Sequence, residues 1–441
     1  MMGRIRQGNH LLVLLKLILI LLPYTLINMI QFIHTADIHF GMENYGKIDH
    51  KTGIHTRLLD FSRSFNFCVD TAIERQVDFF LFSGDAYKTA HPSPTQQKLL
   101  LHAFLRLHHA KIPTIIVVGN HDNPLSFGKA HSLDIFGNLP LDGFHVIAKP
   151  MVVNLVTKSG PINVLCIPWP TRNSLSIDNR YVYKSAAEIT TYISRAVTAI
   201  IQEEARHLDP TVPAVLAGHL TVSSGIFSGS EKRAIYGTDP LFLPSQLAIP
   251  PFDYVALGHL HRYQNLNPNG YPAVVYSGSI DRIDFGERKE DKGFCVVTIE
   301  KKGVTSHEFI QTPARPFIQI EVTLHPEQNQ TEQILHAIKK QSIKDAVVKI
   351  VYHVPESMRD CVDLKKIQYA CESAMHVVGI IPIRKSPVRE RRIGAVKTTM
   401  DLSALLSTYF DTKPDLKKRK EELIQKTLLL AQEENDQEQE E

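Results

Sequence analysis

The sequence predicts an α/β fold with helices on both faces of a sheet, followed by a smaller α+β domain and a pair of helices. Segments typical of strands and of helices alternate from residue 29 to about residue 279, which is the pattern of layered α/β proteins. Polar residues of the types that bind metal ions directly follow several of the strand-like segments. Near Pro313 the pattern changes, and a shorter set of alternating segments begins.

The composition is that of an ordinary globular chain. Its 441 residues are enough for two or three domains. The net charge is only +3, so any surface for nucleic acid has to be a local patch. The five cysteines are scattered and form no CxxC pair, which favours reduced thiols in a cytosol over a disulfide framework.

Residues 1–28 differ from the rest of the chain. Two arginines precede an apolar run from Leu11 to Leu22 that a single lysine interrupts, as in a signal peptide or a short membrane anchor. No small-residue cleavage pattern stands before Ile30, where the first predicted strand begins. In the alternative interpretation, Met29 is the true start and the upstream residues are a leader. We favour this interpretation and expect a cytoplasmic protein, while a membrane-tethered form stays open.

The large domain, residues 29–312, contains most of the predicted elements. Its β-branched and aromatic segments are predicted strands at residues 30–36, 77–82, 114–118, 146–147, 162–167, 214–217 and 254–257. Its amphipathic segments are predicted helices at residues 58–74, 95–110 and 186–206. Ser93 and Pro94 are well placed to cap and open the second helix. We expect the strands at 146–147 and 162–167 to form a second sheet.

The remainder of the chain divides into two parts. Residues 313–395 are predicted to form a small α+β domain with strands at 317–324, 346–352 and 377–383 and helices at 331–340 and 363–375. The basic stretch at its end, residues 384–392, is either a patch facing DNA or a solvated linker. Residues 396–441 are predicted to form two helices with apolar stripes and an acidic tail. The stripes either pack on this chain's own core or bind a partner, and we favour partner binding because they lie beyond the last domain.

Metal-type ligands follow five of the predicted strands. The stretches are Asp37-Ile38-His39, Gly84-Asp85, Gly119-Asn120-His121-Asp122, Gly218-His219 and Gly258-His259-Leu260-His261. Ligands of open α/β sheets bind outside the carboxyl ends of the strands. The mixture of oxygen and imidazole donors suits manganese, iron or zinc. A glycine before the ligand lets the chain turn sharply away from the strand.

The candidate donors are too many for one ion. They are Asp37, His39, Asp85, Asn120, His219, His259 and His261. Such a set suits two divalent ions that share a carboxylate and clamp the attacking and leaving oxygens of a displacement at phosphorus. A hydroxide between the ions would be the nucleophile.

His121 and Asp122 are the candidate catalytic residues beside this set. His121 is expected to stabilise the developing charge and to protonate the leaving oxygen, a task suited to imidazole. Asp122 is expected to orient His121 through a hydrogen bond.

The ordered set D-x-H, G-D, G-N-H-D, G-H and G-H-x-H resembles the signature of the calcineurin-like metallophosphoesterases. Residues 34–41 (HTADIHFG), 83–85 (SGD) with 92–94 (PSP), and 276–279 (YSGS) resemble the SbcD nuclease subunits of bacterial SbcCD DNA exonucleases. The resemblance covers about residues 29–410. It implies a four-layer α/β/β/α sandwich, a capping domain at residues 313–395 and a start close to Met29.

The same resemblance implies how the residues are used. Asp37, His39, Asp85 and His261 would hold one ion, and Asp85, Asn120, His219 and His259 the other. Manganese is the expected metal, and His121 would be the catalytic histidine that is not a ligand. The helix pair would dock on the coiled-coil base of an SbcC-type ATPase, and the protein would act on DNA as a homodimer. Lys88 departs from the acidic or histidine residue that relatives often carry there.

Two enzymatic functions remain as alternatives. The first is a nuclease of DNA repair, recombination and replication, with double-strand 3′-5′ exonuclease and single-strand or hairpin endonuclease activity. The second is a metallophosphatase or cyclic-nucleotide phosphodiesterase on non-DNA substrates. Gly84-Asp85-Ala86-Tyr87-Lys88 differs from the GDxVDRG usual in protein phosphatases, which favours the first. The sequence has no G-x-x-x-x-G-K-[ST] motif, so ATP use is assigned to the partner. A decayed scaffold should lack a ligand, and none is missing.

Overall fold

The computed structural model describes residues 29–124, 129–171, 175, 185–229, 239–384, 402–411, 413, 416 and 419–440. Contacts divide the chain into two compact units. The first contains the chain up to Gln319 together with residues 342–349 and 371–378, and the second contains residues 320–341, 350–370 and the chain from Gly379 onward. The leader 1–28, most of the basic stretch 384–392 and the predicted boundary at 395 lie outside the described residues. These domain limits stay predictions.

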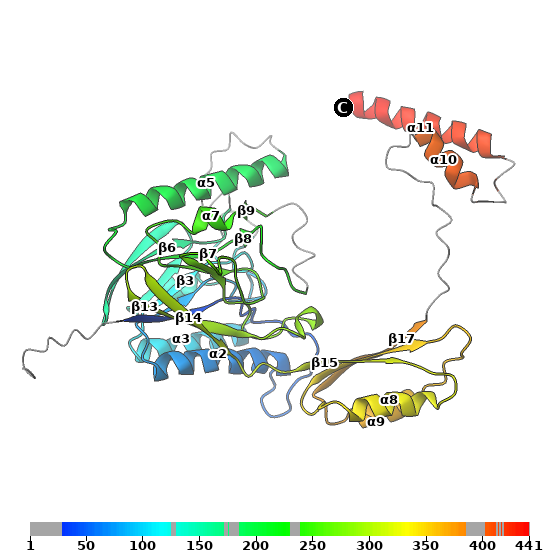
Figure 1. Ribbon diagram of the computed structural model, residues 1–441, viewed down its shortest axis with the longest axis horizontal. Coiled ribbons are helices and arrows are strands. Elements are labelled where there is room, and N and C mark those ends of the chain that lie inside the picture. Colours follow the sequence, from blue (N-terminus) through cyan, green and yellow to red (C-terminus); the bar gives the residue numbers. More distant parts are fainter. Residues whose placement is uncertain are drawn as a thin grey trace, which may run out of the picture. The chain divides into compact units, whose positions relative to one another are not determined.

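The first sheet carries three of the predicted ligand segments. Its order is β14 (Val304–Gln311), β13 (Gly293–Lys301), β1 (Ile30–Thr35), β2 (Phe79–Phe82), β3 (Thr114–Val117) and β4 (Phe144–Ile147). Strands β1 to β4 are parallel, and β13 joins β1 antiparallel. Helices α2 (Thr56–Glu74) and α3 (Pro94–His109) cover its outer face through a core of buried apolar residues (Figure 1).

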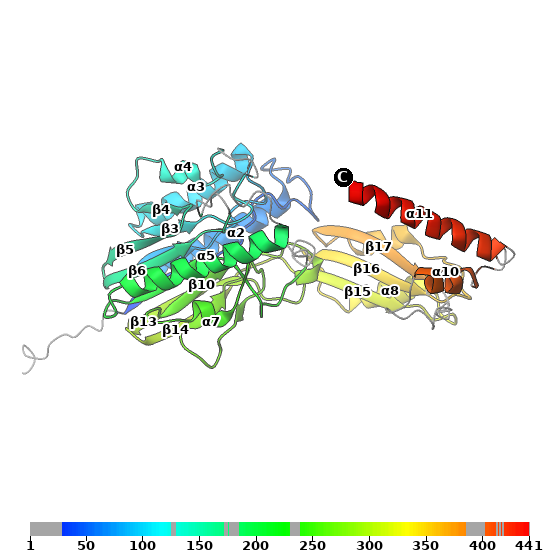
Figure 2. The ribbon, with the colours of Figure 1, turned by 90° about the horizontal axis from the view of Figure 1, so that it is seen from above.

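The second sheet carries the other two ligand segments. Its order is β11 (Gln264–Asn265), β12 (Ala273–Tyr276), β10 (Tyr254–Gly258), β7 (Ala214–His219), β6 (Gly160–Ile167) and β5 (Met151–Thr157). Helices α5 (Ala186–His207) and α7 (Pro244–Leu247) pack on its outer face, and Figure 2 shows α5 lying across it. Phe32, Phe79 and Val215 belong to the apolar layer between the two sheets. The predicted four-layer α/β/β/α sandwich is therefore confirmed.

The sequence predicted the positions of the helices more accurately than it predicted which strands pair. The predicted cap of α3 is present: Ser93 Oγ accepts a hydrogen bond from the Gln96 amide, and Gln96 Oε1 accepts one from the Ser93 amide. The prediction that the strand at 146–147 lies in the second sheet is wrong, because β4 pairs in parallel with β3. The hairpin β13–β14 was not predicted, although it provides the strand beside β1.

The smaller sheet consists of β15 (Phe317–Thr323), β16 (Val347–Val354) and β17 (His376–Arg384). Helices α8 (Gln330–Lys339) and α9 (Leu364–Ala370) lie on one face of it (Figure 1). The helix predicted at 363–375 ends at Ala370 instead. Shortly after this helix end, the Met375 amide donates to the Ala346 carbonyl at 2.9 Å, directly before β17 begins.

Two further helices follow, α10 (Leu402–Asp411) and α11 (Lys420–Glu440), close to the predicted positions. Leu416, predicted to lie in the second of them, precedes it. Within the described part of the chain, no helix is both long and apolar enough to span a membrane.

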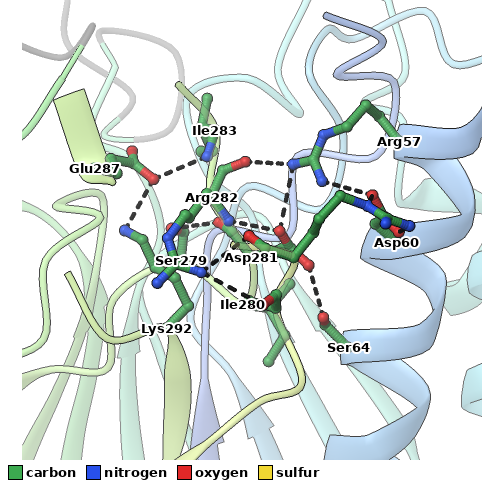
Figure 3. A network of polar contacts seen from close by, with 12 residues as sticks. Arg57, Asp60, Ser64, Ser279, Ile280, Asp281, Arg282, Ile283, Glu287 and Lys292 are labelled. Atoms are coloured by element: carbon green, nitrogen blue, oxygen red, sulfur yellow. Dashed lines mark hydrogen bonds and ion pairs between the residues drawn. The ribbon is translucent and has the colours of Figure 1, made fainter. Parts of the chain in front are cut away.

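A buried arginine joins α2 to the loop that follows β12. The Arg57 side chain is fully buried and pairs with Asp60 Oδ2 at 2.8 Å and with Asp281 Oδ1 at 3.3 Å (Figure 3). Asp281 Oδ2 also accepts a hydrogen bond from Ser64 at 2.7 Å. Removing one member of a buried ion pair leaves an uncompensated charge.

Replacing Arg57 with methionine is therefore expected to lower the free energy of unfolding by about 3–5 kcal/mol. Urea denaturation followed by circular dichroism measures the change. Arg63→Met is the matched control, because Arg63 also pairs with Asp60 but its side chain is 50% exposed. We expect less than about 1 kcal/mol for Arg63→Met. Equal losses in the two variants would contradict the assigned role of Arg57.

Candidate metal centre

All seven predicted ligands meet at the edge where the carboxyl ends of the parallel strands of both sheets come together. The first three ligand segments follow β1, β2 and β3, and the others end β7 or follow β10. The Asp37 amide donates to the Gly84 carbonyl at 2.9 Å, which holds two of these loops side by side. The His259 amide donates to both Asp37 carboxylate oxygens at 3.1 Å, which joins the two sheets.

The backbone is strained at these loops. Asp37, His39, Asp85 and His259 all have positive φ angles, of 53°, 53°, 60° and 105°. Side chains other than glycine rarely adopt this region, and such residues gather at functional sites. Gly119 is required here for a different reason, because a Cβ at this position would lie 2.1 Å from Asp85 Oδ1.

The predicted first metal position comprises Asp37, His39, Asp85 and His261. One ligand atom from each of Asp37, His39 and His261 lies within 4.8 Å of the others. His39 Nε2 lies 4.0 Å from Asp37 Oδ1 and 3.6 Å from Asp85 Oδ2. This nitrogen is buried and has no hydrogen-bond partner among the described residues. A buried ring nitrogen that faces two carboxylates fits a divalent cation.

The predicted second metal position comprises Asp85, Asn120, His219 and His259. His219 Nε2 lies 3.3 Å from Asp85 Oδ2 and 2.9 Å from Asn120 Oδ1. His219 Nδ1 lies 2.8 Å from the Ser83 carbonyl oxygen, so Nδ1 carries a proton and Nε2 is the nitrogen that faces Asp85 and Asn120. Asn120 Oδ1 also lies 3.1 Å from His259 Nδ1. Since Asp85 Oδ2 faces both His39 and His219, this carboxylate is placed to bridge two ions.

Burial and mutual charge determine the protonation of the group. Burial raises the pKa of Asp37 to about 7 and lowers the pKa of His39 well below its usual value. Burial acts to raise the pKa of Asp85 as well, but His219 and His121 outweigh it and hold that pKa well below its ordinary value. The site thus keeps a buried anion at its centre, which a divalent ion would stabilise.

His121 lies at the exposed edge of this site. Its Nδ1 donates to the Lys88 carbonyl at 2.8 Å, and its amide donates to Asp85 Oδ1 at 2.9 Å. A ring nitrogen lies within 4.8 Å of ligand atoms of His39 and Asp85. The other ring nitrogen, Nε2, is therefore left for a substrate, as its predicted role requires.

No hydrogen bond joins the Asp122 carboxylate to the His121 side chain, contrary to the prediction. Its buried carboxylate accepts hydrogen bonds from the backbone amides of Gly119 and Asp85 at 3.0 Å and of Ala86 at 3.1 Å. Burial, reinforced by Asp85, raises the pKa of Asp122 to about 6. The buried Asp122 carboxylate thus joins the two ligand loops, whereas His121 is exposed.

Three residues near the ligands were missed by sequence reasoning. Glu287 Oε1 lies 3.0 Å from His261 Nδ1, and Asp239 Oδ2 lies 3.4 Å from His259 Nε2. Trp169, the only tryptophan, has its ring centre 4.9 Å from that of His259 and 6.0 Å from that of His219. Trp169 follows β6, so its place at a strand end was a usable signal. Glu287 and Asp239 follow no predicted strand.

The fold and this cluster of candidate metal ligands are those of a metal-dependent phosphoester hydrolase. The chain belongs to the calcineurin-like phosphoesterases, because the sequence model of that family matches residues 30–263, more than half of the chain. Among curated proteins it is 27% identical over 294 residues to the D subunit of the SbcCD nuclease from Staphylococcus epidermidis, covering 66% of this chain and 71% of that protein. The predicted family resemblance is confirmed, and this family uses divalent metals.

Two solved structures are also similar. One is a 5′-nucleotidase precursor from Thermus thermophilus, with 13% identity and a TM-score of 0.36 over 64% of this chain and 54% of that one. The chain thus spans about half the length of that nucleotidase precursor. The other is a dimetal phosphatase from Danio rerio, with 11% identity and a TM-score of 0.36 over 64% of this chain and 99% of that one.

Proposed function

We propose that this phosphoester hydrolase is a DNA nuclease of the SbcCD type, with double-strand 3′-5′ exonuclease and single-strand or hairpin endonuclease activity. One observation supports the proposal: the seven candidate ligands gather around the buried Asp85 carboxylate, beside the exposed His121. The similarity to the D subunit of the SbcCD nuclease supports DNA as the substrate. DNA repair, recombination and replication in the cytoplasm are the processes that such an enzyme would serve.

The residues divide the chemistry between them. Two divalent ions, proposed to be manganese, would lower the pKa of a shared water and neutralise charge on the phosphate. Asp85 would be the ligand that both ions share, and Asn120 would supply an uncharged oxygen to one of them. His121, held through Nδ1 by the Lys88 carbonyl, protonates the leaving sugar oxygen from Nε2.

We further propose that α10 and α11 bind the coiled-coil base of an SbcC-type ATPase and that the protein is a homodimer. Large apolar side chains are exposed on both helices: Leu405 and Tyr409 on α10, and Leu429 and Leu430 on α11. Exposed apolar residues on paired helices suit docking against another helix.

The test compares two substrates for the purified protein, alone and with its ATPase partner. With manganese, we expect linear duplex DNA to be degraded, EDTA to stop the reaction, and ATP to stimulate it only when the partner is present. Ending the chain after Arg392 should preserve hydrolysis and remove the ATP stimulation. Turnover of a small chromogenic phosphodiester without any cutting of DNA would instead support a phosphodiesterase on non-DNA substrates.

A further inference from the structure

A buried carboxylate outside the predicted ligand set contacts a ligand of the first metal position. Glu287 ends the turn η2 (Phe285–Glu287) and is fully buried. Its Oε1 lies 3.0 Å from His261 Nδ1. Since a carboxylate only accepts hydrogen bonds, Nδ1 must carry the proton, and the other ring nitrogen is left unprotonated for a metal.

The other carboxylate oxygen of Glu287 is held just as firmly. Oε2 lies 2.9 Å from the buried Lys292 ammonium and accepts a hydrogen bond from the Ile283 amide at 2.8 Å (Figure 3). Lys292 also donates to the His261 carbonyl at 3.0 Å and pairs with Glu290 at 3.1 Å. Both the side chain and the backbone of His261 are therefore tied to one buried ion pair.

We propose that Glu287 is a positioning residue that sets the tautomer and the direction of the His261 ring, and thereby the affinity of the first metal position. The inference rests on the proposed two-ion site. His219 in the second position is oriented by the neutral Ser83 carbonyl instead. A carboxylate partner raises the basicity of a ligating imidazole more than a neutral carbonyl does.

Glu287→Gln is the informative substitution because it changes hydrogen bonding at nearly constant shape. The single amide oxygen of the glutamine should face the Lys292 ammonium and the Ile283 amide, because both are hydrogen-bond donors. An NH2 group in that place would have no acceptor. The NH2 group then faces His261 Nδ1 and forces the proton onto the nitrogen that must bind the ion. Loss of such partners typically weakens metal binding by about 10- to 100-fold.

The experiment titrates the full chain with manganese, without DNA. The concentration of free manganese is measured from its electron paramagnetic resonance signal. Trp169 fluorescence reports on ion binding at the second metal position, because the Trp169 ring lies beside His219 and His259. We expect Glu287→Gln to weaken one of two manganese equivalents by at least about tenfold, while the Trp169 response still saturates. Glu290→Gln is the matched control, since Glu290 pairs with Lys292, and it should bind both ions normally.

Three results would overturn the proposal: unchanged manganese binding in Glu287→Gln, an equal loss in Glu290→Gln, or equal weakening of both equivalents in Glu287→Gln. Thermal melting without metal checks that each variant is folded. If Glu287→Gln does not fold, Glu287→Asp takes its place. It keeps the charge beside Lys292 but withdraws the oxygen from His261, so it should also weaken one equivalent, and normal binding would refute the idea. These readouts do not involve DNA, so they are independent of whether DNA is the substrate.

Discussion

Replacing Asp85 with asparagine is expected to lower the hydrolysis rate by at least roughly 10³-fold, because both metal positions lose their shared anion. Metal ions supply several kcal/mol of transition-state stabilisation, and each 1.36 kcal/mol is worth a factor of ten. Asparagine preserves the shape and still accepts the His121 amide hydrogen bond, which Asp85 Oδ1 accepts at 2.9 Å. The turnover of DNA and of a chromogenic phosphodiester, with manganese counted on the same sample, measures the effect.

Asp37→Asn is the matched control for this prediction. Asp37 is assigned to the first metal position only, so Asp37→Asn should still bind one manganese ion with normal affinity. Asp85→Asn should bind both ions weakly. If Asp85→Asn bound two ions with unchanged affinity, the bridging role of Asp85 would be wrong.

The second large effect is expected from His121→Asn, which should slow DNA hydrolysis by about 10²- to 10⁴-fold without weakening manganese binding. In the unaltered protein, His121 Nδ1 donates a hydrogen bond to the Lys88 carbonyl, so Nε2 is the nitrogen that can transfer a proton to the substrate. A p-nitrophenyl phosphodiester has a leaving group that departs without protonation. The loss on that substrate should therefore be much smaller than the loss on DNA.

His102→Asn serves as the control, since His102 is an exposed histidine on α3, and it should leave both rates unchanged. Equal losses on the two substrates in His121→Asn would argue against proton donation. In that case His121 would act by stabilising charge on the phosphate, which both substrates share.

The sequence by itself predicted the layered α/β class and the ligand set. Each ligand stretch follows an apolar strand, and in four of the five stretches a glycine precedes the ligand. This pattern is local, so no partner segment is needed to see it. The capped start of α3 was equally local. The roles of His121 and of the seven ligands stay predictions, but the structure brings all of these side chains together.

Only the tertiary structure decided which strands pair and which polar residues support the ligands. The strand β4 could join either sheet until its register with β3 was known. Asp122 follows His121 in the chain, but its carboxylate binds the backbone of residues 85 and 86, more than thirty positions away. Glu287 meets His261 across 26 residues. Such contacts depend on how loops from distant strands meet, and no short-range sequence pattern encodes that meeting.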